Sequence, residues 1–100
     1  MKKILLCCAA GMSTSLLVNK MKAEAEKRGL EVQIWAEPLD KAKEEFAKAD
    51  VVLLGPQVKY ALPEAKKIAE ENSISIDVIN MVDYGMMNGA KVLDQALNLL

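Results

Sequence analysis

The positions of hydrophobic residues divide the chain into apolar runs and helical stripes that alternate along its length. Residues 2–8 contain an apolar run without alternation, which is typical of a strand that is covered on both faces. Apolar residues then recur every three or four positions over residues 13–28, and Gly29 follows as a helix stop. Residues 31–36 alternate with a period of two, which is typical of an edge strand with one wetter face. This first part of the chain predicts a strand, a helix and a second strand.

The same order of strand and helix continues to the last residue. The further elements are a short helix near residues 39–46, a strand at residues 51–54, a helix from near Pro63 to near Asn72, a strand at residues 74–79 and a helix over residues 92–100. Asp40 is the expected cap of the short helix, and residues 80–89 are expected to form a loop. Repeated strand–helix units favour an open α/β sheet with right-handed crossovers, in which ligands bind beyond the carboxyl ends of the strands. Cys8, Gln57 and the loop should meet there.

Composition and charge describe a nearly neutral domain with an aliphatic core. Of the 100 residues, 52% are hydrophobic and only 4% are aromatic, and this length suits one domain, residues 1–100. A formal net charge of −1 provides no basic field, so we expect no nucleic-acid partner. No apolar stretch reaches the roughly 18–20 residues that span a bilayer, and the run at residues 4–8 is too short for a signal peptide. The chain is therefore expected to be cytoplasmic.

The sequence has no histidine and two adjacent cysteines, Cys7 and Cys8. The lack of histidine excludes an imidazole of this chain as a base, a metal ligand or a phosphoryl acceptor. Adjacent cysteines do not form the spaced framework of a secreted scaffold, so both are expected to be thiols. Cys7 belongs to the apolar run and is expected in the core, whereas Cys8 ends the strand before a glycine-containing turn. Cys8 is therefore the candidate nucleophile.

The turn after Cys8 combines small residues with hydroxyls at the start of a helix. Its members are Ala9, Ala10, Gly11, Met12, Ser13, Thr14 and Ser15. Small residues allow a tight turn whose N–H groups point inward, and a helix N-terminus adds unpaired N–H donors and about half a positive charge. Such a turn binds anions and activates a cysteine at its edge as a nucleophile. The hydroxyls can donate to phosphate oxygens, although Ser13 is equally suited to capping the helix.

Residues 8–18, Cys-Ala-Ala-Gly-Met-Ser-Thr-Ser-Leu-Leu-Val, resemble the phosphorylation loop of the lactose/cellobiose/chitobiose-type IIB proteins of the bacterial sugar phosphotransferase system. Further matches to the same family are residues 20–21, 25–27 and 49–57, Tyr60, residues 62–64 and Tyr84-Gly85. The resemblance spans essentially the whole chain. It implies an α/β fold with a single open four-stranded parallel sheet in the order 2-1-3-4 and helices on both faces. This topology is similar to that of low-molecular-weight tyrosine phosphatases.

The resemblance also implies a role and partners. Cys8 would accept a phosphoryl group from a phosphohistidine of the IIA protein and pass it to a sugar of the cellobiose, chitobiose or lactose class that the membrane component IIC binds. The chain would be a phosphotransferase without cofactor or metal, acting in the cytoplasm and transiently at the inner face of the membrane through IIC. Gln57, Tyr60 and Tyr84 are candidates for the rim of the pocket. We expect the two tyrosines to pack there and Met81 to lie in the core.

Three other functions fit parts of this sequence, and each lacks a residue or an arrangement that it needs. A low-molecular-weight phosphatase or an arsenate-reductase-like enzyme would have an arginine six positions after the cysteine, where this chain has Thr14. A phosphate-receiving signalling domain needs an aspartate at the end of the third strand, where Leu54 and Gly55 stand. A redox or soft-metal module would use Cys7 and Cys8 together, but adjacent strand residues point to opposite faces. The phosphatase is the main alternative.

Overall fold

The computed structural model describes residues 1–9 and 12–100, and for Met12 and Ser13 it describes the backbone alone. The elements in chain order are β1 (Lys2–Cys8), α1 (Met12–Lys27), β2 (Val32–Pro38), α2 (Leu39–Glu45), η1 (Phe46–Lys48), β3 (Val51–Leu54), η2 (Pro56–Ala61), α3 (Leu62–Glu71), β4 (Ser75–Val78), α4 (Met81–Gly85) and α5 (Gly89–Asn98). The two η elements are 3-10 helices. The strands form one parallel sheet in the order β2-β1-β3-β4, which confirms the predicted topology.

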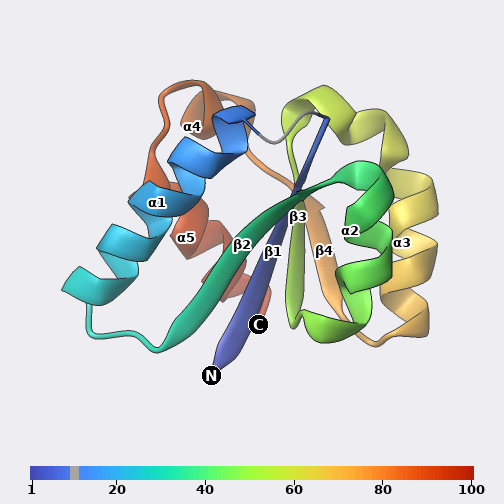
Figure 1. The fold of residues 1–100 in the computed structure, drawn as a ribbon, viewed down its shortest axis with the longest axis horizontal. Helices are drawn as coiled ribbons and strands as arrows, with labels where there is room; N and C mark the ends of the chain where they lie inside the picture. Colours follow the sequence, from blue (N-terminus) through green and yellow to red (C-terminus); the bar gives the residue numbers. More distant parts are fainter. Residues whose placement is uncertain (10–11) are drawn as a thin grey trace.

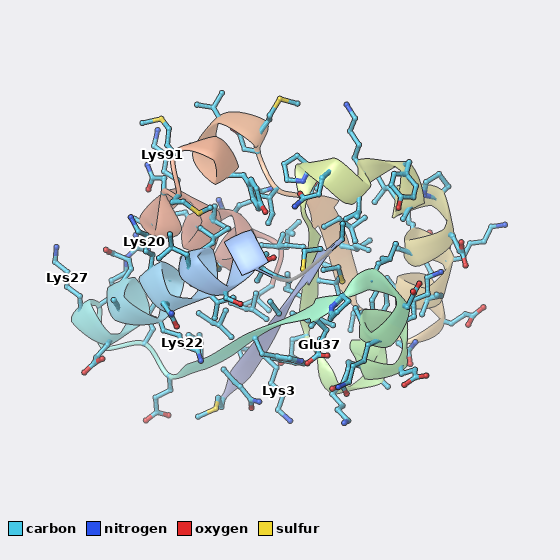
Figure 2. All side chains as sticks on the ribbon, turned by 45° about the horizontal axis from the view of Figure 1, so that its top comes forward. Lys3, Lys20, Lys22, Lys27, Glu37 and Lys91 are labelled. Atoms are coloured by element: carbon cyan, nitrogen blue, oxygen red, sulfur yellow. The ribbon has the colours of Figure 1, made fainter. Side chains whose placement is uncertain are left out.

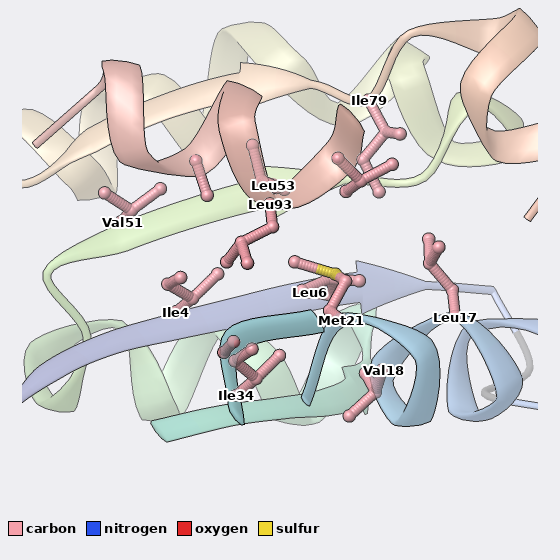
Figure 3. Close-up of a cluster of buried hydrophobic side chains, with 13 residues drawn as sticks. Ile4, Leu6, Leu17, Val18, Met21, Ile34, Val51, Leu53, Ile79 and Leu93 are labelled. Atoms are coloured by element: carbon pink, nitrogen blue, oxygen red, sulfur yellow. The ribbon is translucent and has the colours of Figure 1, made fainter. Parts of the chain in front are cut away.

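Helices cover both faces of the sheet, with α1, α4 and α5 on one face and α2 and α3 on the other (Figure 1). The side chains of β1 alternate between these two layers. Ile4 and Leu6 belong to the cluster beneath α1 and α5, whereas Leu5 and Cys7 belong to the cluster beneath α2 and α3. Figure 3 shows the first cluster, in which Leu6 lies close to Met21 of α1. β1 is thus buried on both faces, as its unbroken apolar run predicted.

α1 ends at the predicted glycine. Gly29 has a φ angle of 70°, in the left-handed region that favours glycine. The N–H of Gly29 donates to the carbonyl oxygen of Glu26 at 3.1 Å, and the N–H of Leu30 donates to that of Ala25 at 2.9 Å. This pair of bonds satisfies the last carbonyl groups of the helix and turns the chain toward β2.

The predicted cap of α2 is wrong. The helix begins at Leu39, directly after Pro38, and no side chain forms a capping hydrogen bond at this end. Pro38 has a φ angle of −59°, which already suits a helix start, so the helix begins one residue before Asp40. Asp40 lies in the first turn instead, where its negative charge interacts favourably with the positive end of the helix dipole.

The prediction of a plain loop over residues 80–89 is also wrong, because this segment contains α4. The Asn80 side chain accepts hydrogen bonds from the N–H groups of Val82 and Asp83 at 2.9 and 3.1 Å. These bonds satisfy donors that the helix leaves unpaired at its start. A helix of five residues is too short to produce a periodic hydrophobic pattern, so the sequence did not reveal it.

Charged side chains cover the outer surfaces of the helices. Lys20, Lys27 and Lys91 are exposed and point away from the sheet on the side of α1 and α5 (Figure 2). No helix in the described part of the chain combines the length and apolar character needed to cross a membrane.

The edge strand β4 is fastened to α5 by side-chain hydrogen bonds. The N–H of Val78 donates to Asp77 Oδ1 at 2.8 Å, and the carbonyl oxygen of Val78 accepts from Gln95 Nε2 at 2.8 Å. Gln95 Nε2 also donates to Asp77 Oδ2 at 3.1 Å, and Gln95 Oε1 accepts from the N–H of Asn80 at 3.2 Å. One glutamine of α5 therefore connects the end of β4 to the cap of α4.

α1 and α5 approach each other closely at Gly89. A Cβ atom at this position would lie 2.7 Å from the carbonyl carbon of Lys20 and 2.9 Å from the nitrogen of Met21. Both are backbone atoms of a helix and have little room to move aside. We expect Gly89→Ala to lower the free energy of unfolding by about 1–3 kcal/mol, measured by urea denaturation.

Gly85→Ala is the matched control for this substitution. No atom lies within 4 Å of the Cβ position at Gly85, so the methyl group meets nothing there. The control should change the free energy of unfolding by less than about 1 kcal/mol. Equal losses in the two variants would contradict the close packing of α1 on α5.

Candidate functional site

Cys8 ends β1 on the side of the sheet that faces α1. It follows Ile4 and Leu6 in the alternation of β1, and both of these belong to the cluster beneath α1 and α5. The Cys8 side chain is buried, and its Sγ atom donates a weak hydrogen bond to the carbonyl oxygen of Glu37 at 3.8 Å. Glu37 belongs to the neighbouring strand β2. The thiol is therefore held between the ends of two strands.

Cys7 lies on the opposite face of β1 and has a different environment. It is fully buried in the cluster beneath α2 and α3, as the sequence predicted. Burial raises the pKa of the Cys7 thiol to about 12, and the neighbouring charge of Cys8 acts in the same direction. Cys7 is thus a protonated packing residue at neutral pH, and the two thiols do not face a common ligand.

The N-terminus of α1 follows Cys8 along the chain and carries a positive end that no acidic side chain of its first turn balances. α2, α3 and α4 carry Asp40, Glu64 and Asp83 in their first turns, whereas α5, like α1, carries no acidic residue there. The first N–H groups of a helix lack partners within the helix, and together with the helix dipole they attract an anion. This end of α1 is therefore suited to binding negative charge.

The residues predicted to form the phosphate-binding turn are only partly described. Those outside the described part of the chain are Ala10, Gly11 and the side chains of Met12 and Ser13. Ala9 and Ser15 are exposed, and Ser15 takes part in an interaction of its own. Thr14 is fully buried, and its Oγ1 atom has no hydrogen-bond partner among the described residues. Of the hydroxyls that the structure describes in this turn, only that of Thr14 is enclosed by protein.

Gln57 and Tyr84 meet beside the end of β1. Gln57 Nε2 donates a hydrogen bond to the Tyr84 hydroxyl oxygen at 2.9 Å, which joins η2 to α4. The Gln57 carboxamide lies over Gly55, where a Cβ atom would be only 2.5 Å from Gln57 Oε1. The N–H of Gly55 in turn donates to the carbonyl oxygen of Cys7 at 2.8 Å. Segments that are far apart in sequence thus converge at the carboxyl ends of β1 and β3.

Two other side chains are not where the sequence analysis expected them. Tyr60 is 74% exposed, because η2 buries Val58 and Ala61 instead; its side chain is therefore not packed, and its place at the rim of the pocket stays a prediction. Met81 is 64% exposed, so the prediction that it fills the core is also wrong. From α4 it is Tyr84, and not Met81, that packs against the cluster beneath α1 and α5.

Asn80 also contributes to this site, although the hydrophobic pattern of the sequence did not indicate it. By capping α4, Asn80 fixes the orientation of the helix that carries Tyr84. An asparagine followed three residues later by Asp83 is a recognised start signal for a helix, and it was present in the sequence.

No guanidinium group lies beside Cys8 or the N-terminus of α1. Arg28 is the only arginine of the sequence, and it lies just beyond the C-terminus of α1. Its side chain donates to Asp94 Oδ1 at 2.6 Å and to Glu24 Oε2 at 2.7 Å, and these hydrogen bonds, the one to Asp94 most, raise the pKa of Arg28. A helix of sixteen residues is about 24 Å long, which separates Arg28 from Cys8. Within residues 1–9 and 12–100, no three Cys, Asp or Glu residues are grouped to hold a metal ion.

Comparison with known proteins identifies close relatives over the full length of the chain. Residues 3–95 match the family model described as "PTS system, Lactose/Cellobiose specific IIB subunit". The oligo-beta-mannoside-specific EIIB component of Bacillus subtilis (strain 168) is 53% identical over 100 residues, which cover 100% of this chain and 97% of the relative. The galactose-specific EIIB component of Lactococcus lactis subsp. cremoris (strain MG1363) is 48% identical over 104 residues, covering 99% and 96%.

A solved structure has the same fold. The lactose-specific IIB component domain of Streptococcus pneumoniae superimposes with a TM-score of 0.89 at 23% sequence identity. The superposition covers 98% of this chain and 96% of the other. The arrangement of strands and helices described above is thus shared with that domain.

The environment of Cys7 predicts that it reacts slowly with thiol reagents. In the Cys8→Ser variant Cys7 is the one thiol left, and its raised pKa keeps it protonated at neutral pH. Alkylation by iodoacetamide should be slow at pH 7 and should speed up about tenfold per pH unit below its pKa, as followed by mass spectrometry. The same variant unfolded in guanidinium chloride is the control and should be alkylated at the rate of an exposed cysteine. Fast native alkylation at pH 7 would contradict the burial of Cys7.

Proposed function

The chain belongs to the lactose/cellobiose-specific IIB family of the phosphotransferase system, and from that membership we propose that Cys8 is the residue that carries the phosphoryl group. As a IIB subunit, the chain is a phosphotransferase of sugar uptake that works with other components of the system. The observation that carries the assignment to Cys8 is its position. It ends β1 on the α1 side of the sheet, directly before a helix N-terminus without acidic residues in its first turn.

The proposed reaction has two transfers of one phosphoryl group. First, a phosphohistidine of the IIA protein donates: the Cys8 thiolate forms an S–P bond while the N–P bond breaks, and the imidazole nitrogen keeps the electron pair and takes up a proton. Second, a hydroxyl oxygen of the sugar bound by IIC forms an O–P bond while the S–P bond breaks. The thiolate is regenerated, and the hydroxyl proton leaves to solvent. Nothing is oxidised or reduced in either transfer.

The electrostatic support for both transfers comes from backbone groups. Negative charge on the three phosphoryl oxygens would meet the N–H groups of the turn, residues 9–15, and the positive end of α1. Gln57 and Tyr84 would form the rim on the β3 side, held to each other by their hydrogen bond. Tyr60 is exposed on η2, and its place at the rim stays a prediction.

The placement of Arg28 favours a carrier over a phosphatase. Hydrolysis of a phosphocysteine by water is helped by an arginine that binds the equatorial oxygens in a bidentate manner. The only arginine is engaged with Glu24 and Asp94 at the far end of α1, and Thr14 occupies the position that a phosphatase loop gives to arginine. An imidazole leaving group needs less help than an alkoxide, so positioning and N–H donors suffice for transfer.

The proposed setting follows the same family. The chain would act in the cytoplasm as one domain, residues 1–100, and would reach the inner face of the membrane only through IIC. The sugar belongs to the cellobiose, chitobiose and lactose class. The names of the relatives cover oligo-beta-mannoside and galactose, so the shared site does not itself select one sugar.

The assignment of Cys8 is tested by labelling with a phosphorylated IIA protein. We expect one phosphoryl group to be added to the wild type and to Cys7→Ala, and none to Cys8→Ser, as measured by intact mass. Circular dichroism of each variant controls for folding. Labelling that persists in folded Cys8→Ser, and disappears in folded Cys7→Ala, would move the acceptor to the other thiol.

The absence of a guanidinium at the site predicts very weak hydrolysis. The purified chain should release phosphate from an aryl phosphate at neutral pH no faster than Cys8→Ser does. Thr14→Arg would add a planar donor near the phosphoryl oxygens and should shorten the lifetime of the phosphocysteine. Sustained multiple turnover by the wild type would favour the phosphatase function instead.

A further inference from the structure

Gln95 of α5 uses its whole carboxamide group in hydrogen bonds inside the protein. Nε2 donates to the carbonyl oxygen of Val78 at 2.8 Å and to Asp77 Oδ2 at 3.1 Å, and Oε1 accepts from the N–H of Asn80 at 3.2 Å. Both N–H donors of the amide are therefore occupied. Asp77 and Val78 are the last residues of β4, and Asn80 caps α4. Gln95 thus joins the end of the sheet to the start of α4.

The start of α4 determines where Tyr84 lies. The carbonyl oxygen of Asn80 accepts from the N–H of Tyr84 at 2.9 Å, and the Asn80 side chain accepts from the first N–H groups of the helix. α4 has only five residues, so its own hydrogen bonds stabilise it little and its position depends on these contacts. The Tyr84 hydroxyl oxygen accepts from Gln57 Nε2 at 2.9 Å. A displacement of Asn80 would therefore move Tyr84 and, through it, the Gln57 carboxamide.

The Gln57 carboxamide lies beside the last residues of the strand that carries Cys8. A Cβ atom at Gly55 would be 2.5 Å from Gln57 Oε1 and 3.3 Å from the carbonyl oxygen of Cys7. Gln57 therefore packs over the backbone at the carboxyl ends of β3 and β1. Both α4 and η2, which carries Gln57, lie at this end of the sheet (Figure 1). The contacts from Gln95 to Gln57 thus end next to the proposed acceptor.

We propose that Gln95 is a positioning residue for phosphoryl transfer, because it fixes the start of α4 and thereby the Tyr84–Gln57 pair beside Cys8. This inference rests on the proposed function, in which Gln57 and Tyr84 form the rim of the site. In this role Gln95 acts through Asn80 and Tyr84 and touches neither the phosphoryl group nor a partner. A rim that is already held in one arrangement does not have to be ordered during the reaction, so transfer is faster.

A groove beside Gln95 separates this role from a general role in folding. The groove has a volume of about 610 Å³, and its lining includes the polar side chains of Asp77, Asn80, Gln95 and Asn98. Water can enter a polar groove of this size and bond to the groups that a substitution of Gln95 would leave unpaired. We therefore expect such a variant to fold. Water does not, however, fix α4 in one position.

Gln95→Glu tests this inference because it keeps the size of the side chain and replaces the donor Nε2 by an acceptor oxygen. This oxygen would face two other acceptors, the Val78 carbonyl oxygen and Asp77 Oδ2, so the connection to α4 should be lost. The rate of phosphorylation at saturating phosphorylated IIA should fall about threefold to tenfold, as followed by intact mass. The half-saturating concentration of IIA should stay the same, since no contact with IIA is removed.

Asn98→Asp is the matched control. It makes the same change from amide to acid on the same helix and beside the same groove. Asn98 is exposed, and its side chain forms no hydrogen bond with another described residue. This variant should therefore transfer at the wild-type rate.

Tyr84→Phe tests the route from Gln95 to the site. It removes the hydroxyl that accepts from Gln57 and should itself slow transfer. If Gln95 acts through Tyr84, Gln95→Glu should slow Tyr84→Phe no further. Asp77→Asn should restore part of the rate of Gln95→Glu, because its amide can donate to the new carboxylate and its oxygen can still accept from the N–H of Val78.

Three results would overturn the role of Gln95: a wild-type rate in folded Gln95→Glu, a wild-type rate in folded Tyr84→Phe, or losses that multiply when the two substitutions are combined. If Gln95→Glu does not fold, Gln95→Ala takes its place in both comparisons, because water can reach the groups that it leaves. None of these results affects the assignment of Cys8 as long as Cys8→Ser cannot be labelled. Labelling that survives in folded Cys8→Ser would overturn the proposed function itself.

Discussion

The register of β1 between its two neighbours decides which of two adjacent thiols lies on the side of the sheet that α1 covers. Cys7 pairs with Glu37 of β2 and with Leu54 of β3, and its carbonyl oxygen accepts from the N–H of Gly55 at 2.8 Å. Because side chains alternate along a strand, a shift of β1 by one residue would exchange the environments of Cys7 and Cys8. Cys8 would then lie beneath α2 and α3, away from the N-terminus of α1. The chemistry of the site depends on this register.

The hydrophobic pattern alone does not oppose such a shift strongly, since both faces of β1 are apolar. The register is fixed instead at the start of the strand. The N–H of Lys3 donates to Asp50 Oδ2 at 2.8 Å, and its carbonyl oxygen accepts from the N–H of Asp50 at 2.8 Å. A shift in one direction would also bring the exposed Lys3 to the buried position of Ile4. The exposed pair Lys3 and Asp50 at one end of the strand thus determines the environments of Cys7 and Cys8 at the other.

The sequence predicted those parts of the molecule that depend on repeated patterns. The strands, α1 and its stop at Gly29 follow from hydrophobic periodicity and from one glycine with positive φ. Prediction from the sequence failed where one local feature determines whether a helix forms or where it begins. α4 forms because the Asn80 side chain caps it, and α2 begins at Leu39 because Pro38 already has a helical φ angle. At the candidate site, position along the chain pointed to Cys8. The burial of Thr14 was not predictable, because a hydroxyl at a helix start resembles an ordinary cap until its surroundings are known.

The hydrogen bonds at the end of β4 also affect how the sheet can interact with other chains. An edge strand normally offers unpaired backbone groups to any extended segment that arrives, and this is how sheets grow into aggregates. In β4, the N–H and the carbonyl oxygen of Val78 are already bonded to Asp77 and Gln95. A foreign strand would have to break both bonds before it could add to the sheet there, and β4 is only four residues long. The two hydrogen bonds therefore oppose strand addition at the carboxyl end of β4, which is the same end of the parallel sheet as Cys8.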